Sequence, residues 1–304
     1  MDQGPQPPRR ITPFAGVPAV MTPARFPLGD FELEHLVHDA LFEDRAFEDI
    51  TTIATVRTDR RARARLVARA DGVLAGVPIA IETFRTMDEK ISIRVDREDA
   101  SRVARGDSVL YLTGHARSLL SAERVALNFL QRLSGIATLT RRYVDAVRGT
   151  RAEILDTRKT TPGSRELEKY AVRCGGGVNH RMNLASAVLI KDNHLAALDG
   201  DIALAVARCR EHAPPGTFVQ VECDRPAQVE AAIAAHADAV LLDNMTLDTI
   251  RDCVAMAKGK VASEVSGGVT LATVRAIAET GVDRISVGAL THSAPALDLA
   301  LDFE

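Results

Sequence analysis

Six short apolar runs in the second half of the chain constrain its fold more than any other feature. They are AEILDTRK (152–159), AVLIKDNH (187–194), TFVQVECD (217–224), AVLLDN (239–244), KVASEVSGG (260–268) and RISVGAL (284–290). Most are separated by Ala-rich stretches of helical pattern, such as RPAQVEAAIAAHA. Alternating strands and helices form βαβ units with right-handed crossovers and a parallel sheet. Six units without a GxGxxG motif after the first strand predict a parallel α/β barrel rather than an open dinucleotide-binding sheet.

Residues 25–120 show a different pattern, which predicts a first domain of strands and helices. RARARLVARA alternates charged and small or apolar residues, so we expect a half-buried strand whose arginines lie on its solvated face. ISIRVDRE and DSVLYLTGHA continue the strand pattern. The following segment, LLSAERVALNFLQRLSGIATLTRRYVDAV, predicts one or two long amphipathic helices with a break at Gly135.

Composition excludes several classes of function. The formal net charge is -3, so no overall positive field attracts nucleic acid. The four cysteines have no metal-ligand spacing, which indicates reduced thiols and a cytoplasmic protein, with Cys174 as a packed thiol. No run of 18 apolar residues is present, so we expect no membrane span.

Polar residues follow each apolar run. In a parallel barrel the carboxyl ends of the strands form the active-site face, so we expect these residues to gather there. The strand ends and the loop after the first strand carry Arg158, Lys159, His180, Arg181, Lys191, Asp192, His194, Glu222, Asp224, Asp243, Asn244, Ser266, Gly267, Gly268, Gly288 and Ala289.

The cations of this set predict an anionic ligand. Like charges repel when they are desolvated together, so a site that gathers several cations needs a ligand with several negative charges. A multi-carboxylate, a phosphate or both would satisfy Arg158, Lys159, Arg181 and Lys191, with His180 beside them. The alternative is that these cations form surface salt bridges with neighbouring Asp and Glu.

Glu222 and Asp243 occupy equivalent positions on successive runs. Two such carboxylates can hold Mg²⁺ together with a diphosphate, or they can stabilise a positive sugar centre. The alternative is that Asp224 and Asp243 cap the helices that follow. The glycines of SGG and VGAL let a phosphate approach backbone N–H groups, or they are simple turn glycines.

At this point the sequence resembles the quinolinate phosphoribosyltransferase family. The resemblance rests on TRKTTPGSRELEKYAVRCGGGVNHR, LIKDNH, VECD, LLDN, EVSGG and VGALTHS, with FEDITT and AERVALNFLQRLSGIAT before them. It covers residues 28–304. It implies an N-terminal open α/β sandwich, an incomplete α/β barrel, and a C-terminal tail that returns to the first domain. We therefore expect the sandwich (26–122), the barrel (123–290) and the tail (291–304). Residues 1–25 are rich in Pro, which resists helix formation, so we expect a mobile arm there.

The resemblance also implies a reaction. Quinolinate reacts with 5-phosphoribosyl 1-diphosphate and Mg²⁺ to give nicotinate mononucleotide, diphosphate and CO₂, a step of de novo NAD biosynthesis. It implies a homodimer, or a hexamer of dimers, in which Arg124 completes the partner's site. The motif positions that match the family's substrate-binding residues are Thr157, Arg158, Lys159, His180, Arg181, Lys191, Glu222, Asp243, Ser266, Gly267, Gly268, Gly288, Ala289 and Leu290. Among them, Lys159, Lys191, Glu222 and Asp243 match catalytic positions, and the last two match the metal-binding acids.

The chain departs from the family pattern at one place. After NHR the family usually has Gly-Leu and an acidic residue, whereas this chain has MNLASAV, with Asn183 and Ser186. Both residues precede the apolar run, so we expect only a local change in the loop.

Three competing hypotheses for the function stay open. A paralogous family linked to molybdenum transport shares the fold but generally lacks KDNH. A lyase could form a Schiff base on Lys191 at the end of a barrel strand. A non-catalytic sensor of phosphorylated metabolites would bind the ligand without releasing diphosphate.

Overall fold

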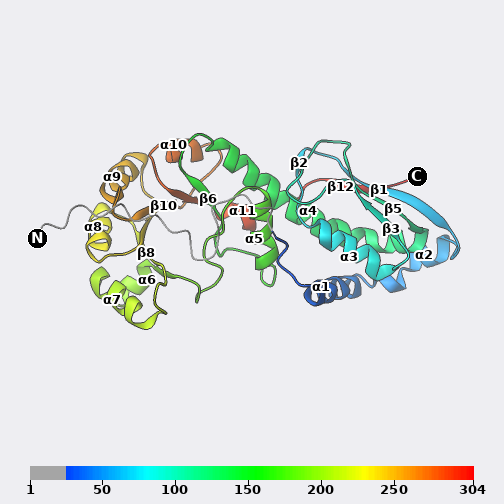
Figure 1. Ribbon diagram of the computed structural model, residues 1–304, viewed down its shortest axis with the longest axis horizontal. Coiled ribbons are helices and arrows are strands. Elements are labelled where there is room, and N and C mark those ends of the chain that lie inside the picture. Colours follow the sequence, from blue (N-terminus) through cyan, green and yellow to red (C-terminus); the bar gives the residue numbers. More distant parts are fainter. Residues whose placement is uncertain (1–24) are drawn as a thin grey trace, which may run out of the picture. The chain divides into compact units, whose positions relative to one another are not determined.

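The computed structural model describes residues 25–304, so the predicted Pro-rich arm (1–25) lies outside the described residues except for Arg25. The described chain divides into two compact units (Figure 1). The barrel unit comprises Arg142–Lys159 and Val178–Gly288. The sandwich unit comprises residues 25–141, Thr160–Gly177 and Ala289–Glu304.

The barrel unit contains one parallel sheet, as the six apolar runs predict. Its strands are β6 (Glu153–Leu155), β7 (Val188–Ile190), β8 (Val219–Cys223), β9 (Ala239–Asp243), β10 (Ala262–Ser266) and β11 (Arg284–Ser286). Their spatial order is β6-β11-β10-β9-β8-β7, with every paired neighbour parallel. Within residues 25–304, β6 and β7 are the two edges of this sheet, so the barrel is incomplete. All six carboxyl ends therefore lie on one face.

Helices follow most of these strands and cover the sheet (Figure 1). They are α6 (Asp192–Ala196), α7 (Ile202–His212), α8 (Pro226–Ala234), α9 (Leu247–Ala257) and α10 (Val274–Ala278). Each longer helix buries a few apolar residues, for example Val206, Val229 and Ile250. This burial keeps the strand ends in place, because packing rather than propensity stabilises short helices.

Neither Asp224 nor Asp243 caps the helix that follows it, so the capping hypothesis is wrong. The N-cap of α8 is Arg225, without a side-chain bond. The N-cap of α9 is Thr246, whose hydroxyl accepts from the N–H of Thr249. A cap must directly precede its helix, and two residues separate Asp243 from Thr246.

The sandwich unit is built on an antiparallel sheet of order β12-β1-β5-β3. The strands are β1 (Arg61–Ala68), β3 (Ser92–Val95), β5 (Ser108–His115) and β12 (Leu299–Phe303), and β2 (Gly72–Val73) pairs with β4 (Arg102–Val103). Residues of the predicted tail form β12, which pairs with β1 from Ala64↔Phe303 to Ala68↔Leu299. The helical segments are α1 (Asp30–Glu43), η1 (Ala46–Glu48), α2 (Ile50–Thr55), α3 (Val77–Met87), α4 (Ala116–Ala146), α5 (Arg165–Cys174) and α11 (Ala289–His292).

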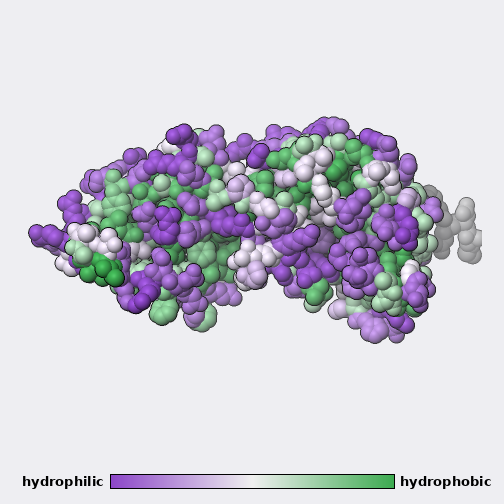
Figure 2. Space-filling view, turned by 180° about the vertical axis from the view of Figure 1, so that it is seen from behind, coloured by the Kyte–Doolittle hydropathy of each residue, from purple (hydrophilic) through white to green (hydrophobic). Residues whose placement is uncertain are grey.

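The first helices of the sandwich unit expose large apolar side chains. These are Phe31 and Phe42 of α1, Phe47 of η1, and Ile50 and Ile53 of α2, and Ile50 is 82% exposed. Figure 2 shows a hydrophobic area at the end of the unit where Figure 1 places α2. Grouped exposed apolar side chains mark surfaces that other molecules cover.

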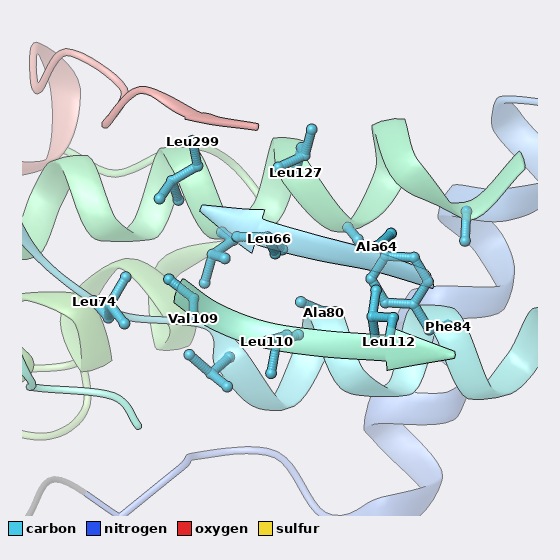
Figure 3. Close-up of a cluster of buried hydrophobic side chains, with 14 of the residues drawn as sticks. Ala64, Leu66, Leu74, Ala80, Phe84, Val109, Leu110, Leu112, Leu127 and Leu299 are labelled. Carbon is cyan, nitrogen blue, oxygen red and sulfur yellow. The ribbon is translucent and has the colours of Figure 1, made fainter. Parts of the chain in front are cut away.

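The sandwich core lies between this sheet and the helices α3 and α4. Figure 3 shows Leu66 on β1, Leu110 and Leu112 on β5, and Phe84 on α3 pointing toward one another, and all four are fully buried. In β1 the alternation holds as predicted: Arg61, Arg63 and Arg65 are exposed, whereas Ala64 and Leu66 are buried. The RARAR run is therefore the solvated face of a strand.

Helix α4 is one continuous helix of 31 residues, so the predicted break at Gly135 is wrong. A Cβ atom at residue 135 would lie 2.1 Å from the carbonyl oxygen of Pro295. Glycine is present there because the chain before β12 crosses the helix at close range. The sequence could not reveal this contact between segments 160 residues apart in number.

The barrel unit begins at Arg142 and ends at Gly288, whereas the sequence led us to expect 123–290. The physical reason is the packing of α4. Its residues Leu119, Leu127 and Leu130 belong to the same hydrophobic cluster as Leu66 and Leu112. The helix therefore groups with the sandwich unit as far as Arg141.

The N-cap of α2 provides a test of local stability. The Asp49 carboxylate accepts from the N–H of Thr52 and from the Ser121 hydroxyl, both at 3.0 Å. These hydrogen bonds lower the pKa of Asp49 below its usual 3.8, and the bond with Thr52 has the largest effect. We expect Asp49→Ala to reduce the free energy of unfolding by about 1 kcal/mol in urea at pH 7.

The same prediction has a pH dependence. Because the folded-state pKa is lowered, the stabilisation is present above pH 3.8 and is lost as the pH falls through the folded value. The difference between Asp49→Ala and wild type should therefore shrink on acidification below pH 3.8. The control Asp39→Ala, on the exposed side of α1, should stay within about 0.5 kcal/mol of wild type. A difference that is the same at pH 7 and pH 3 would contradict the role of the ionised cap.

Candidate active site

The residues of KDNH lie partly at the end of strand β7 and partly in the first turn of helix α6. Lys191 follows β7, and its ammonium lies 2.6 Å from the Glu222 carboxylate of the neighbouring strand β8. Asp192 begins α6 directly, and Nδ1 of His194 accepts from the N–H of Lys191. Lys191 therefore joins the functional face, while His194 stabilises the first turn of α6.

The Lys191–Glu222 pair is only partly buried. The Lys191 side chain is 46% exposed and that of Glu222 is 14% exposed. The predicted alternative of a salt bridge is thus correct for Lys191, although its partner is itself a candidate site residue. A lysine that forms a Schiff base is activated by an apolar pocket or another cation, and Lys191 instead lies beside a carboxylate.

Arg158 and Arg181 are the cations that best indicate an anion site. Arg181 is 8% exposed, and its guanidinium donates to the Ala187 carbonyl. Burial, and then the positive charge of Arg158, lower the pKa of Arg181. Within residues 25–304, Nε of Arg158 is buried without a hydrogen-bond partner and no carboxylate pairs with Arg181. Two uncompensated guanidinium groups close together are costly unless an anion binds them.

A buried carboxylate organises the backbone beside these cations. Asp156 follows β6 and is fully buried. It accepts from the Asn179 amide and, at 2.9 Å, from the backbone N–H of His180. In turn, the N–H of Arg181 donates to Nδ1 of His180 at 2.8 Å. The 178–181 segment is therefore held against the end of β6.

A second buried carboxylate, Glu264 of β10, lies inside the barrel unit. It accepts from the Gln220 amide of β8 at 3.0 Å and from the Ser286 hydroxyl of β11 at 2.5 Å. Nε2 of His180 lies 3.5 Å from the same carboxylate. Sequence reasoning missed Asp156 and Glu264. Each is a charged residue in an otherwise apolar run. Such a residue indicates a buried carboxylate with hydrogen-bond partners, because charged groups are rarely buried without them.

Asp243 is the last residue of β9, and Glu222 is the next-to-last residue of the adjacent strand β8. Asp243 accepts from the Asn244 amide at 2.7 Å. In residues 25–304 no three His, Cys, Asp or Glu side chains are arranged to hold a metal ion. Two carboxylates suit Mg²⁺ only when a substrate supplies further oxygens.

The SGG turn requires glycine at one position. Gly267 has φ of +92°, and a Cβ there would lie 2.2 Å from Oδ1 of Asn244. Ser266 ends β10 and accepts from the N–H of Asn244. Gly288 ends the barrel unit, and Ala289 and the buried Leu290 begin α11 of the sandwich unit.

The remaining predicted residues are placed as follows. Thr157 follows Asp156 after β6, and its hydroxyl accepts from the N–H of Lys159 at 3.1 Å. Lys159 is exposed and ends the first segment of the barrel unit. Arg124 belongs to α4 in the sandwich unit and is exposed.

The departure at Asn183 and Ser186 forms a local turn. The Ser186 hydroxyl donates to the Asn183 carbonyl, and Oδ1 of Asn183 accepts from the N–H of Ala185. The turn is exposed and precedes β7. Cys174, predicted as a packed thiol, is buried and forms no disulfide within the described chain, and burial raises its pKa to about 12.

The fold and the strand-end residues define a parallel α/β-barrel protein whose functional face combines desolvated guanidinium groups with a Lys–Glu pair. No helix of residues 25–304 is long and apolar enough to cross a membrane. The model of the quinolinate phosphoribosyl transferase N-terminal domain matches residues 49–134, and that of the C-terminal domain matches residues 136–302. The chain belongs to the quinolinate phosphoribosyltransferase family.

Known proteins with similar sequences align with almost the whole of this chain. A nicotinate-nucleotide pyrophosphorylase [carboxylating] of Mycobacterium leprae is 44% identical over 274 residues, 88% of this chain and 95% of that protein. A probable enzyme of the same name from Bacillus subtilis is 40% identical over 275 residues, 90% of this chain and 94% of that protein. The structure of the nicotinate-nucleotide pyrophosphorylase from Francisella tularensis has a TM-score of 0.87 and 42% identity, covering 91% of this chain and 98% of that one.

Proposed function

We propose that this protein transfers the phosphoribosyl group of 5-phosphoribosyl 1-diphosphate to quinolinate with loss of CO₂. The products are nicotinate mononucleotide and diphosphate, as the names of the relatives suggest. The observation that carries the proposal is the Arg158–Arg181 pair, two neighbouring guanidinium groups without a carboxylate partner among the described residues.

Quinolinate fits this charge arrangement because it is a planar dianion. Arg158 and Arg181 offer planar forks for its two carboxylates, and Lys159 adds a point charge. His180 lies beside them, and its Nδ1 accepts from the N–H of Arg181. Bound in this way, the ring nitrogen of quinolinate is oriented toward the sugar carbon that it attacks.

The acidic residues act on the sugar side of the reaction. As diphosphate leaves, positive charge grows on the ribose, and Glu222 and Asp243 stabilise it electrostatically. Lys191 holds the Glu222 carboxylate in place at 2.6 Å. Ser266, Gly267 and Gly268, together with Gly288, Ala289 and Leu290, are proposed to bind the 5′-phosphate through backbone N–H groups.

Mg²⁺ is proposed as the cofactor, arriving with the diphosphate and contacting Glu222 and Asp243 directly or through water. When bound, it neutralises charge on the leaving diphosphate. After the new C–N bond forms, the ring nitrogen is cationic. The electron pair of the bond to the adjacent carboxylate stays on the ring carbon as CO₂ departs, stabilised by this nitrogen, and the carbon then takes a proton from solvent. No nucleophilic side chain is needed, which agrees with the inert, buried Cys174.

Product formation tests the function directly. The protein is incubated with quinolinate, 5-phosphoribosyl 1-diphosphate and Mg²⁺, and nicotinate mononucleotide, diphosphate and CO₂ are measured. We expect the three products in equal amounts. Turnover of nicotinic acid in place of quinolinate would contradict the proposal, and binding without release of diphosphate would favour a metabolite sensor.

We also propose a homodimer, alone or as part of a hexamer of dimers. The exposed apolar residues of α1, η1 and α2 support an interface with a second copy. Arg124 is exposed, and its guanidinium forms no ion pair or hydrogen bond within the part of the chain that the structure describes. It is therefore available to complete the partner's site. The four free cysteines favour a reducing compartment, here the cytoplasm, although an Arabidopsis thaliana relative is described as chloroplastic.

Mixing inactive variants tests whether the site is shared. Arg124→Ala and Lys191→Ala chains should each be inactive alone. If Arg124 acts across the dimer, an equal mixture recovers about a quarter of wild-type activity, because half of the dimers are mixed and each has one intact site. Mixing Arg124→Ala chains with Arg124→Ala/Lys191→Ala chains should recover none. The absence of recovery in the first mixture would show that Arg124 acts within its own chain.

A further inference from the structure

Glu264 is a fully buried carboxylate that the proposed reaction does not use. It lies on β10, two residues before Ser266, and three donors from three different segments face it. Ser286 and Gln220 donate to its two oxygens, and Nε2 of His180 lies 3.5 Å from Oε1. An acceptor-only group satisfies this set, because every neighbour contributes a proton.

The His180 ring is fixed from its other side. Its Nδ1 accepts from the N–H of Arg181 at 2.8 Å, so this nitrogen carries no proton. The proton of the ring is then on Nε2, the atom that faces Glu264. His180 is 7% exposed. If Nδ1 were protonated, its N–H group would face the backbone N–H of Arg181, and the two donors would repel each other.

We propose that Glu264 is a positioning residue, which holds His180 in the neutral Nε2–H tautomer and thereby fixes the backbone of Arg181 at the substrate-binding face. Charged groups beside His180 include Glu264 on β10, Asp156 after β6, which accepts from the backbone N–H of His180, and Arg181 itself. His180 contributes shape and direction to the site but no positive charge. This role in quinolinate binding rests on the proposed function.

Among the residues expected to bind quinolinate, His180 is then an uncharged ring. The positive charge of the site then comes only from guanidinium and ammonium groups. Quinolinate affinity should not weaken as the pH rises through the usual imidazole range, from about 6 to 8. A carboxylate paired with a ring nitrogen sets the tautomer in many functional histidines.

The variant Glu264→Gln tests the role of the charge with little change of shape. Its amide NH₂ can face Gln220, whose buried Oε1 has no hydrogen-bond partner within the described residues. The Gln220 amide can turn to accept this bond, so the variant should fold. Its remaining oxygen still accepts from Ser286, but the negative charge opposite His180 is gone.

Two measurements follow. In ¹⁵N-labelled wild-type protein, the His180 signals, assigned by their loss in His180→Gln, should show Nε2 protonated and Nδ1 unprotonated from pH 6 to 8. In Glu264→Gln the KM for quinolinate should rise about tenfold with kcat within about twofold, because orientation of Arg181 affects binding rather than chemistry. The control Ser263→Ala, another buried residue of β10, should leave KM unchanged.

The two readouts separate this proposal from the proposed function. The tautomer is measured on the protein alone, so it stands even if quinolinate is not the substrate. A His180 ring that carries its proton on Nδ1, or that titrates between pH 6 and 8, overturns the proposal. So does a Glu264→Gln enzyme whose KM equals that of wild type, or whose kcat falls at unchanged KM.

Discussion

Arg181→Ala should lower kcat/KM for quinolinate by about 10- to 150-fold, mainly through KM. A hydrogen bond to a charged group contributes about 1.5–3 kcal/mol, and each 1.4 kcal/mol is a factor of ten. The effect is expected at Arg181 because its guanidinium is desolvated and near Arg158 rather than a carboxylate. Steady-state kinetics with quinolinate varied at saturating 5-phosphoribosyl 1-diphosphate measures it.

Two further variants make this prediction specific. Arg181→Lys keeps the charge but loses the planar fork, so its kcat/KM should lie between those of wild type and Arg181→Ala. Arg208→Ala, an exposed position on α7, should behave as wild type. Because Arg181 also donates to the Ala187 carbonyl, thermal unfolding of each variant must be recorded. Unchanged quinolinate affinity in folded Arg181→Ala would refute the anion site.

Lys191→Ala should reduce kcat by about 10²–10³ while changing stability little. Removing one preorganised electrostatic partner of a reacting centre typically costs that much in rate. The Lys191–Glu222 pair is partly exposed, and such pairs contribute about 1 kcal/mol or less to folding. A large loss of rate without a loss of stability identifies a functional rather than a structural ion pair.

A matched pair in the same unit serves as the control. Arg251 and Asp248 of α9 form an exposed ion pair, and Arg251→Ala should change neither kcat nor stability appreciably. In a double-mutant cycle, Lys191→Ala and Glu222→Ala should be strongly non-additive in kcat, since each removes the same pair. Additive effects would mean that the two side chains act independently.

Much of the barrel unit could be predicted from local sequence. Each of the six apolar runs forms a strand of the parallel sheet, because hydrophobic periodicity and chain connectivity restrict how strands that alternate with helices can pair. The position of Lys191 just after β7 follows from the same pattern. The alternation in β1 likewise predicts which residues of RARAR are exposed.

Other features depend on contacts between distant segments. The sequence suggests a break at Gly135, yet α4 continues, because the glycine accommodates the chain at Pro295. It suggests that Asp243 caps a helix, yet Thr246 does so. Neither the continuity of α4 nor the N-cap of α9 can be predicted from the local sequence, because both depend on where the backbone lies after folding.

The sequence by itself determined the parallel barrel, the family and the residues that end each strand, because these follow from periodicity, connectivity and long ordered motifs. Only the tertiary structure decided what the charged groups do. It pairs Lys191 with Glu222, leaves Arg158 and Arg181 without a carboxylate among the described residues, and sets His180 against Glu264. The physical reason is that charge and protonation depend on distance and desolvation, which chain order does not specify.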